Sequence, residues 1–222
     1  MATPTLTRHD QVFVLDFGDD ENVTSDKWVT TVQQLLDEVD AAEGPRALVT
    51  MGSGKHYSNG LDVSFMSALS GEEISAYVDR VLALVYRLML IDVPTVAAVN
   101  GHAFGMGAFL AITHDHAIMR ADRGYVCFPE VHIGMSFPEQ LLCVARASLS
   151  PPTLRQALTS GRRYSGPEAA AAGIVNSAAS IDDLVTEAKA HATQLASTAG
   201  KSLGQIKRQI LTDVAARLPR KK

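Results

Sequence analysis

The sequence predicts an α/β fold organised around a parallel sheet. Buried-looking strands at residues 12–17, 47–51 and 95–99 alternate with amphipathic helices, a rhythm typical of right-handed β-α-β crossovers. The 222 residues are 46% apolar and 20% charged, which suits one large globular domain or two small ones. Glycine and small polar residues follow two of the strands, where α/β folds place their ligands. We therefore expect the functional residues at 52–62 and 93–130.

The N-terminal elements follow from capping and periodicity. Residues 12–17 read as a strand, and Ser25 or Asp26 can cap the helix that follows, whose apolar residues fall on one face. Gly44 and Pro45 end that helix, and residues 47–51 form a second strand.

The next segment combines turn residues with a long helix. Asp62 is expected to cap the segment 63–66, although a role at the ligand is also open. Lys55 could meet a phosphate, but a lone lysine is by default solvated. An amphipathic helix begins at Gly71 and stops before Pro94, because the residue preceding proline is pushed out of helical geometry.

The stretch 93–130 carries the expected chemistry. Its strand at 95–99 ends at Asn100-Gly101, and a turn of Gly105, Met106 and Gly107 precedes an apolar helix at 108–112. Such glycines let the backbone approach a ligand and leave N–H groups free at a helix start, which favours an oxyanion. They could equally serve a tight turn alone. Two further strands, at 117–120 and 125–128, lead to one carboxylate, Glu130.

The last third of the chain is predicted to be mostly helical. Glu139 suits the first turn of a helix over 140–148. Further along, Pro151 starts a short helix, an alanine-rich helix ends at Gly173, a strand covers 174–176, and helices cover 181–195 and about 203–218.

Composition excludes several classes of protein. A net charge of −4 argues against a nucleic-acid binder, and no apolar run is long enough to span a membrane. Cys127 and Cys143 are expected to be buried free thiols, and the histidines show no metal-ligand spacing. We interpret His114 and His116 as ordinary surface or strand-edge residues. Without a signal peptide or a peroxisomal Ser-Lys-Leu ending, the protein is expected in the cytoplasm.

Four pieces of the sequence resemble the enoyl-CoA hydratase/isomerase family, also called the crotonase superfamily. They occur in family order and the resemblance covers about residues 10 to 215. As a set the pieces are specific, although each one alone is not. They are GKHYSNGLD, PTVAAVNGHAFGMGAFLAITHD, FPEVHIGM and LTSGRRYSGPEAAAAGIVN.

The resemblance implies a crotonase (ClpP/crotonase-like) fold of repeated β-β-α units with a helical C-terminal region. The core domain is then 1–195, with a short helical segment at 196–222, and the chain forms a homotrimer or a dimer of trimers. The substrate is an acyl-CoA thioester, so CoA enters with the substrate and no separate cofactor or metal is expected. Two backbone N–H groups, of Leu61 and Met106, would hold the thioester oxygen. The implied substrate-binding residues are Ser58, Asn59, Gly60, Asp62, Phe65, Gly105, Gly107, Phe109 and Met135.

One position departs from the pattern of the family's hydratases, which carry two glutamates. The first aligns with Phe109 and the second with Glu130, so this chain keeps one carboxylate. The resemblance is therefore closest to the Δ3,Δ2-enoyl-CoA isomerase type, in which one glutamate moves a proton from C2 to C4 during fatty-acid β-oxidation. Burial of Glu130 among Phe109, Phe128, Met135 and Phe137 would raise its pKa.

Three alternatives remain open at this point. Glu139 could face the same pocket and act as a rival or second acid–base group, which would favour an enoyl-CoA hydratase. Another crotonase-type reaction of an acyl-CoA is the second alternative. The third is a catalytically silent acyl-CoA-binding homologue.

Overall fold

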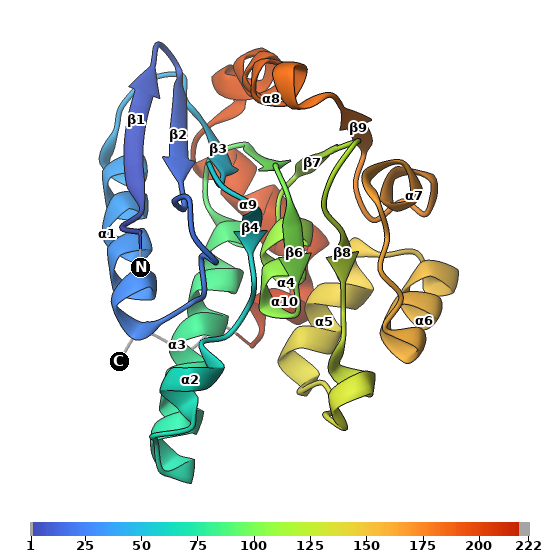
Figure 1. Cartoon of the computed structure of the whole chain (residues 1–222). Coiled ribbons are helices and arrows are strands. Elements are labelled where there is room, and N and C mark those ends of the chain that lie inside the picture. Colours follow the sequence, from blue (N-terminus) through green and yellow to red (C-terminus); the bar gives the residue numbers. More distant parts are fainter. Residues whose placement is uncertain (1, 218–222) are drawn as a thin grey trace.

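A computed structural model describes residues 2–217 of the chain, and its centre is a six-stranded sheet. The strand order is β1-β2-β3-β5-β7-β9 (Figure 1). β1 and β2 form an antiparallel hairpin, and every later neighbour is parallel. The strands are β1 (Thr5–His9), β2 (Val12–Asp16), β3 (Ala47–Met51), β5 (Thr95–Val99), β7 (His116–Arg120) and β9 (Ser177–Ala179).

Helices follow the strands and cover both faces of this sheet. Ser25 caps α1 by accepting a hydrogen bond from the Trp28 N–H, and Ser70 caps α3 in a reciprocal capping box with Glu73. The helices are α1 (Asp26–Ala41), α2 (Val63–Met66), α3 (Gly71–Leu90), α4 (Met106–Ile112), η1 (Glu130–Ile133), α5 (Glu139–Ser148), α6 (Pro151–Ser160), α7 (Gly166–Ala171), α8 (Ile181–Leu195), η2 (Ala196–Thr198), α9 (Lys201–Ile210) and α10 (Thr212–Ala215).

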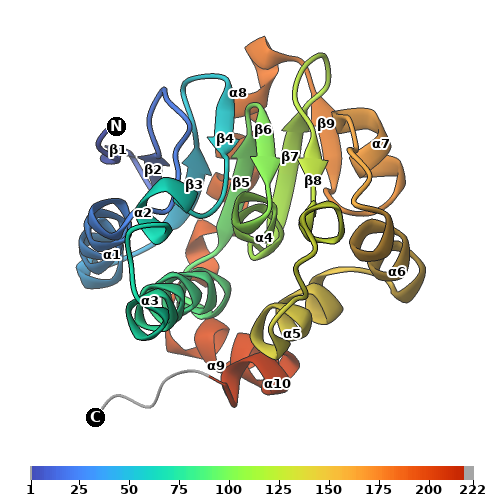
Figure 2. The same ribbon diagram turned by 60° about the horizontal axis from the view of Figure 1, so that its bottom comes forward.

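The alternation of side chains along the strands explains the two apolar layers. Successive residues of a strand face opposite sides of the sheet, so a strand covered on both sides reads as a continuous apolar run. One layer lies under α8, and the larger one lies on the side of α1, α3 and α4 (Figure 2). The α8 layer contains Val12, Val14, Val49, Val96, Ala98, Ile118, Leu184 and Ala188, whereas Phe13, Leu15, Leu48, Ala97, Val99 and Met119 face the other way.

A second, three-stranded parallel sheet determines where the site lies. It consists of β4 (His56–Ser58), β6 (His102–Phe104) and β8 (Val126–Cys127), in that order. Each strand leads within three residues to one predicted functional group. These are Leu61 after β4, Met106 after β6 and Glu130 after β8. Since parallel strands end at the same edge of a sheet, the three groups are brought to one edge.

Several predicted boundaries were wrong. The strand at 174–176 lies instead at Ser177–Ala179, because the Ile174 and Val175 N–H groups both donate to Ala169 O and close the end of α7. Their apolar character reflects burial in this turn rather than a strand. The third strand of the central stretch is shorter than 125–128, and the apolar helix begins at Met106 rather than at residue 108.

The C-terminal helix also differs from the prediction. The helix expected over 203–218 is divided into α9 and α10, with Leu211 between them outside helical geometry. Position 218 lies outside the described residues. The predicted boundary between residues 195 and 196 falls between α8 and η2 and stays a prediction. None of the helices within residues 2–217 is long and apolar enough to cross a bilayer.

His114 is half-buried and hydrogen-bonded, whereas we interpreted it as an ordinary surface or strand-edge residue. Its ring contacts Thr50 Oγ1 at 2.8 Å and Leu110 O at 2.9 Å, and burial lowers its pKa to about 4. Next to it, Asp115 accepts a hydrogen bond from Lys207 Nζ at 2.6 Å, which attaches α9 to the end of α4. These groups line a crevice of about 500 Å³ but are already paired with one another, so they offer no free base.

Candidate active site

The two predicted N–H donors lie on adjacent backbone segments. Within residues 2–217, neither the Leu61 N–H nor the Met106 N–H has a hydrogen-bond acceptor. Met106 is the first residue of α4, where a helix leaves its N–H groups unpaired. A Cβ placed on Gly60 would lie 3.2 Å from the Met106 nitrogen, so the residue before Leu61 touches the second donor. Two free donors on touching segments suit a single oxygen with developing negative charge.

Glycine makes this close approach possible. Gly60 has a φ of +92°, and a Cβ there would lie 2.7 Å from the Phe104 carbonyl oxygen. A Cβ at Gly107 would collide with the carbonyl oxygen of Ser58. Gly105, with a φ of +52°, turns the chain from β6 into α4. The structure thus shows the tight turn, one of the two interpretations left open, and the oxyanion-binding role stays a prediction.

Glu130 lies directly against this turn. A Cβ built on Gly105 would be 3.6 Å from Glu130 Oε1, which places the carboxylate beside the start of α4. The other oxygen, Oε2, is buried and has no hydrogen-bond partner in the described part of the chain. Burial raises the pKa of Glu130, partly offset by its own backbone N–H. A buried carboxylate with a free oxygen and a raised pKa can both take and return a proton near neutral pH.

This raised pKa predicts how stability changes with pH. The folded protein binds the Glu130 proton more tightly than the unfolded chain does, so ionisation of Glu130 opposes folding above its raised pKa. Glutamine is neutral at every pH. We expect Glu130→Gln to raise the melting temperature at pH 8, with the difference shrinking as pH falls through the raised pKa towards 4. Thermal melts of both proteins across this range test it, and a lower melting temperature of Glu130→Gln at pH 8 would contradict it.

Phe109, four residues after the Gly105 turn, places an aromatic ring in the core rather than a carboxylate. It is fully buried and meets Phe128 edge-to-face at 5.1 Å and Phe137 at 5.9 Å between ring centroids. The three aromatic residues expected around Glu130 therefore form one contiguous cluster. Met135 does not complete it, because 53% of its surface is exposed. The prediction that Met135 buries the carboxylate is wrong for a single chain, since Gly134 turns left-handed after η1 and leaves Met135 outside.

The family model for enoyl-CoA hydratase/isomerase matches residues 8–222. The chain belongs to the enoyl-CoA hydratase/isomerase family. Enoyl-CoA delta isomerase 2, peroxisomal, of Arabidopsis thaliana is 33% identical over 183 residues, covering 79% of this chain and 76% of that protein. A candidate enoyl-CoA hydratase of Thermus thermophilus is 34% identical over 208 residues, covering 91% and 81%.

A solved structure confirms the fold. Human mitochondrial Δ3-Δ2-enoyl-CoA isomerase superimposes with a TM-score of 0.91, covering 98% of this chain and 86% of that one, at 21% identity. This superposition confirms the predicted crotonase fold, and the family model confirms the predicted family. Membership makes the chain an acyl-CoA isomerase or hydratase of the crotonase family.

Several predicted substrate-binding residues hold the backbone on either side of Leu61 in place. Ser58 is buried, donates its hydroxyl to Asn22 O at 2.8 Å and accepts from the Gly60 N–H at 3.3 Å, which fixes the turn before Leu61. The Asn59 N–H donates to Glu21 O. The capping role of Asp62 is confirmed, because its carboxylate accepts from the Phe65 N–H at 2.9 Å.

Glu139, the rival acid–base group, forms an ion pair on its own helix. Its carboxylate is paired with Arg146 at 2.8 Å on the same helix, and its side chain is 54% exposed. The hydrogen bond from Arg146 lowers the pKa of Glu139, which is opposite to what a proton shuttle near neutral pH needs. The prediction that Glu139 occupies the first turn of its helix is confirmed.

Sequence reasoning missed two residues that support the first donor. Asn22, at a φ of +49°, donates its amide to Gly18 O and His56 O at 3.0 Å and so ties the loop after β2 to β4. The Tyr77 hydroxyl donates to Thr24 O at 2.8 Å and accepts from the Asp62 N–H at 3.1 Å. Asn22 could have been noticed as an asparagine in a turn, but Tyr77 looks like any core residue of α3.

Proposed function

We propose that this enzyme is a Δ3,Δ2-enoyl-CoA isomerase that acts in the breakdown of unsaturated fatty acids. The proposal rests on two observations together: Glu130 is half-buried with its Oε2 atom unpartnered among the described residues, and position 109 carries a buried aromatic ring instead of a second carboxylate. A hydratase of this family uses a second carboxylate there to orient and activate water. Phe109 can do neither, whereas a proton transfer within one substrate needs only one group.

The reaction follows from where charge develops. The thioester oxygen accepts hydrogen bonds from the Leu61 and Met106 N–H groups. The Glu130 carboxylate removes a proton from C2, the electron pair of that C–H bond forms a C1–C2 double bond, and the π pair of the C1–O bond moves onto the thioester oxygen. As this dienolate collapses, the oxygen restores the C1–O double bond, the C1–C2 π pair becomes the C2–C3 double bond, and the C3–C4 π pair takes the proton back from Glu130 at C4. The substrate gains and loses no atoms, and the carboxylate is regenerated.

The electrostatics of the site support this scheme. The dienolate concentrates negative charge on the thioester oxygen, and donors fixed in place stabilise that charge without reorganising. Burial raises the pKa of Glu130 and so brings it closer to the pKa of the substrate C–H group with which Glu130 exchanges the proton. The ring cluster of Phe109, Phe128 and Phe137 supports the exclusion of water from the intermediate.

A paired assay on the purified protein tests the proposal. We expect 3-hexenoyl-CoA to be converted to the conjugated 2-enoyl thioester, and 2-hexenoyl-CoA to resist hydration, both followed by absorbance of the conjugated thioester. Rapid loss of conjugation from 2-hexenoyl-CoA would instead establish a hydratase, the activity in the name of the Thermus thermophilus relative. Tight acyl-CoA binding with no turnover of either compound would support a silent binding homologue.

The assembly is proposed to be a homotrimer or a dimer of trimers. Two isoleucines of α9, Ile206 and Ile210, are 50% and 76% exposed, an arrangement that supports burial of this helix between subunits. The cytoplasm remains the compartment we propose.

A further inference from the structure

We propose that the acyl tail of the substrate leaves the site across the exposed apolar surface of Val131, Ile133 and Met135, here named the acyl lip. The lip would make the enzyme selective for long-chain over short-chain acyl-CoA thioesters. This inference rests on the proposed function, because it takes the thioester oxygen to lie at Leu61 and Met106.

The interior offers the tail no room on the core side of the carboxylate. Phe109 and Phe128 are fully buried and in edge-to-face contact, and the side chain of Met106 is 4% exposed within the same core cluster. Displacing close-packed rings to admit an alkyl chain costs free energy, because packed interiors hold few voids. A tail longer than a few carbons must therefore turn outward.

The acyl lip is the first surface such a tail would meet. Its residues lie one, three and five positions after Glu130, and the Met135 N–H donates to Glu130 O at 3.0 Å, which folds the segment back beside the carboxylate. Val131, Ile133 and Met135 are 46%, 64% and 53% exposed. Single exposed apolar residues are ordinary, but three in five residues form a patch that favours an apolar ligand.

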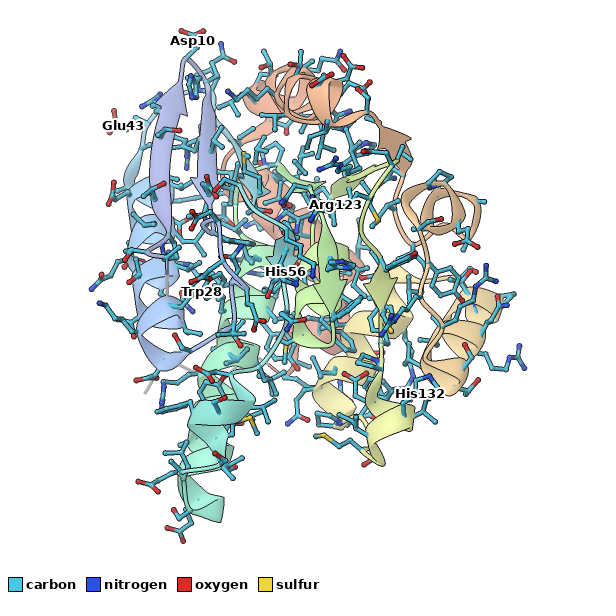
Figure 3. All side chains as sticks on the ribbon, in the orientation of Figure 1. Asp10, Trp28, Glu43, His56, Arg123 and His132 are labelled. Atoms are coloured by element: carbon cyan, nitrogen blue, oxygen red, sulfur yellow. The ribbon has the colours of Figure 1, made fainter. Side chains whose placement is uncertain are left out.

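The polar residue of this segment is turned aside. His132 projects from η1 toward α6 (Figure 3), and a Cβ on Gly161 would lie 2.6 Å from its Cδ2 atom. The lip thus faces solvent with apolar side chains and carries no charge of its own, which suits an alkyl chain rather than a charged partner.

The loop of the first donor, Leu61, also presents an exposed apolar residue. Val63 lies two positions after Leu61, opens α2 and is 73% exposed, while Phe65 packs edge-to-face on Tyr77 at 5.4 Å. α2 and η1 lie on opposite sides of the start of α4 (Figure 1). The turns that follow Leu61 and Glu130 are thus both apolar, and we take the tail to run over the turn that follows Glu130.

The experiment compares kcat/KM for 3-hexenoyl-CoA and 3-dodecenoyl-CoA. Each methylene covered by the lip should raise kcat/KM about fourfold, so the dodecenoyl compound should be favoured by more than about tenfold. Ile133→Ser should lower the dodecenoyl-to-hexenoyl ratio about fivefold to tenfold. Ile181→Ser is the matched control, since Ile181 is an exposed isoleucine at the start of α8, and it should leave the ratio as in the wild type.

Three outcomes would overturn the inference. The first is equal kcat/KM for both chain lengths in the wild type. The second is an Ile133→Ser ratio equal to that of the wild type. The third is a change of mass in size-exclusion chromatography on Ile133→Ser with the ratio unaltered, which would assign the lip to a second copy of the chain.

Failure of the proposed function itself is distinguishable. If the wild type isomerises neither compound, calorimetric binding of saturated hexanoyl-CoA and dodecanoyl-CoA replaces the rates. A preference for dodecanoyl-CoA that Ile133→Ser reduces would uphold the lip without the reaction, and equal affinities would overturn it.

Discussion

Glu130→Gln is expected to lower kcat for 3-hexenoyl-CoA by about 10³-fold, within the range that loss of a general acid–base group produces. Glutamine has nearly the size of glutamate but cannot accept the C2 proton. Because Glu130 Oε2 has no partner among the described residues, the substitution breaks no hydrogen bond of that atom. Steady-state rates and a circular dichroism spectrum, measured on the same preparation, separate lost chemistry from lost folding.

Glu139→Gln is the matched control for this experiment. Glu139 is half exposed and paired with Arg146, and an exposed ion pair contributes little to stability. We expect its kcat to stay within about twofold of the wild type, in keeping with the small effect of such pairs. The proton-shuttle assignment fails if Glu130→Gln keeps wild-type kcat. If Glu139→Gln loses the activity instead, Glu139 is the base.

The second large effect is expected from Gly107→Ala. A Cβ at this position would collide with the Ser58 carbonyl oxygen, which belongs to the backbone and cannot rotate away. The start of α4 must therefore move away from the turn at residues 58–60, and the two N–H donors separate. Loss of one such donor costs about 10²- to 10³-fold in kcat, and we expect a loss of this size in kcat for 3-hexenoyl-CoA.

Gly71→Ala provides the comparison for the glycine substitution. Gly71 begins α3, and a Cβ there would meet no atom within 4 Å. We expect activity and melting temperature close to those of the wild type. A Gly107→Ala protein that folds and keeps wild-type kcat would show that the close approach of the two segments is not needed for catalysis.

Local sequence features were sufficient for the four central strands of the large sheet and for the helix caps. The strand at 47–51 and the helix capped by Ser25 were predicted correctly, because strand burial and helix capping depend on neighbours in the chain. The resemblance to the family also placed Leu61, Met106 and Glu130, whose positions at one edge the fold explains. Their roles in catalysis stay predictions.

The small sheet could not be predicted in the same way. β4 and β6 are three residues each, and their sequences HYS and HAF lie within stretches that read as loops. Such strands are stabilised by pairing with partners some 25 to 45 residues away rather than by their own pattern. His114 shows the same limit, because its burial depends on Thr50, which is 64 residues away in the chain.

By itself, the sequence determined the fold class and the family, since these depend on periodicity, capping and motif order, and it predicted which groups react. Only the tertiary structure decided that Glu130 Oε2 has no partner within residues 2–217, that Glu139 forms an ion pair with Arg146 and that Met135 is exposed. The physical reason is that the pKa and exposure of a side chain depend on which distant segments surround it, and no local pattern encodes those neighbours.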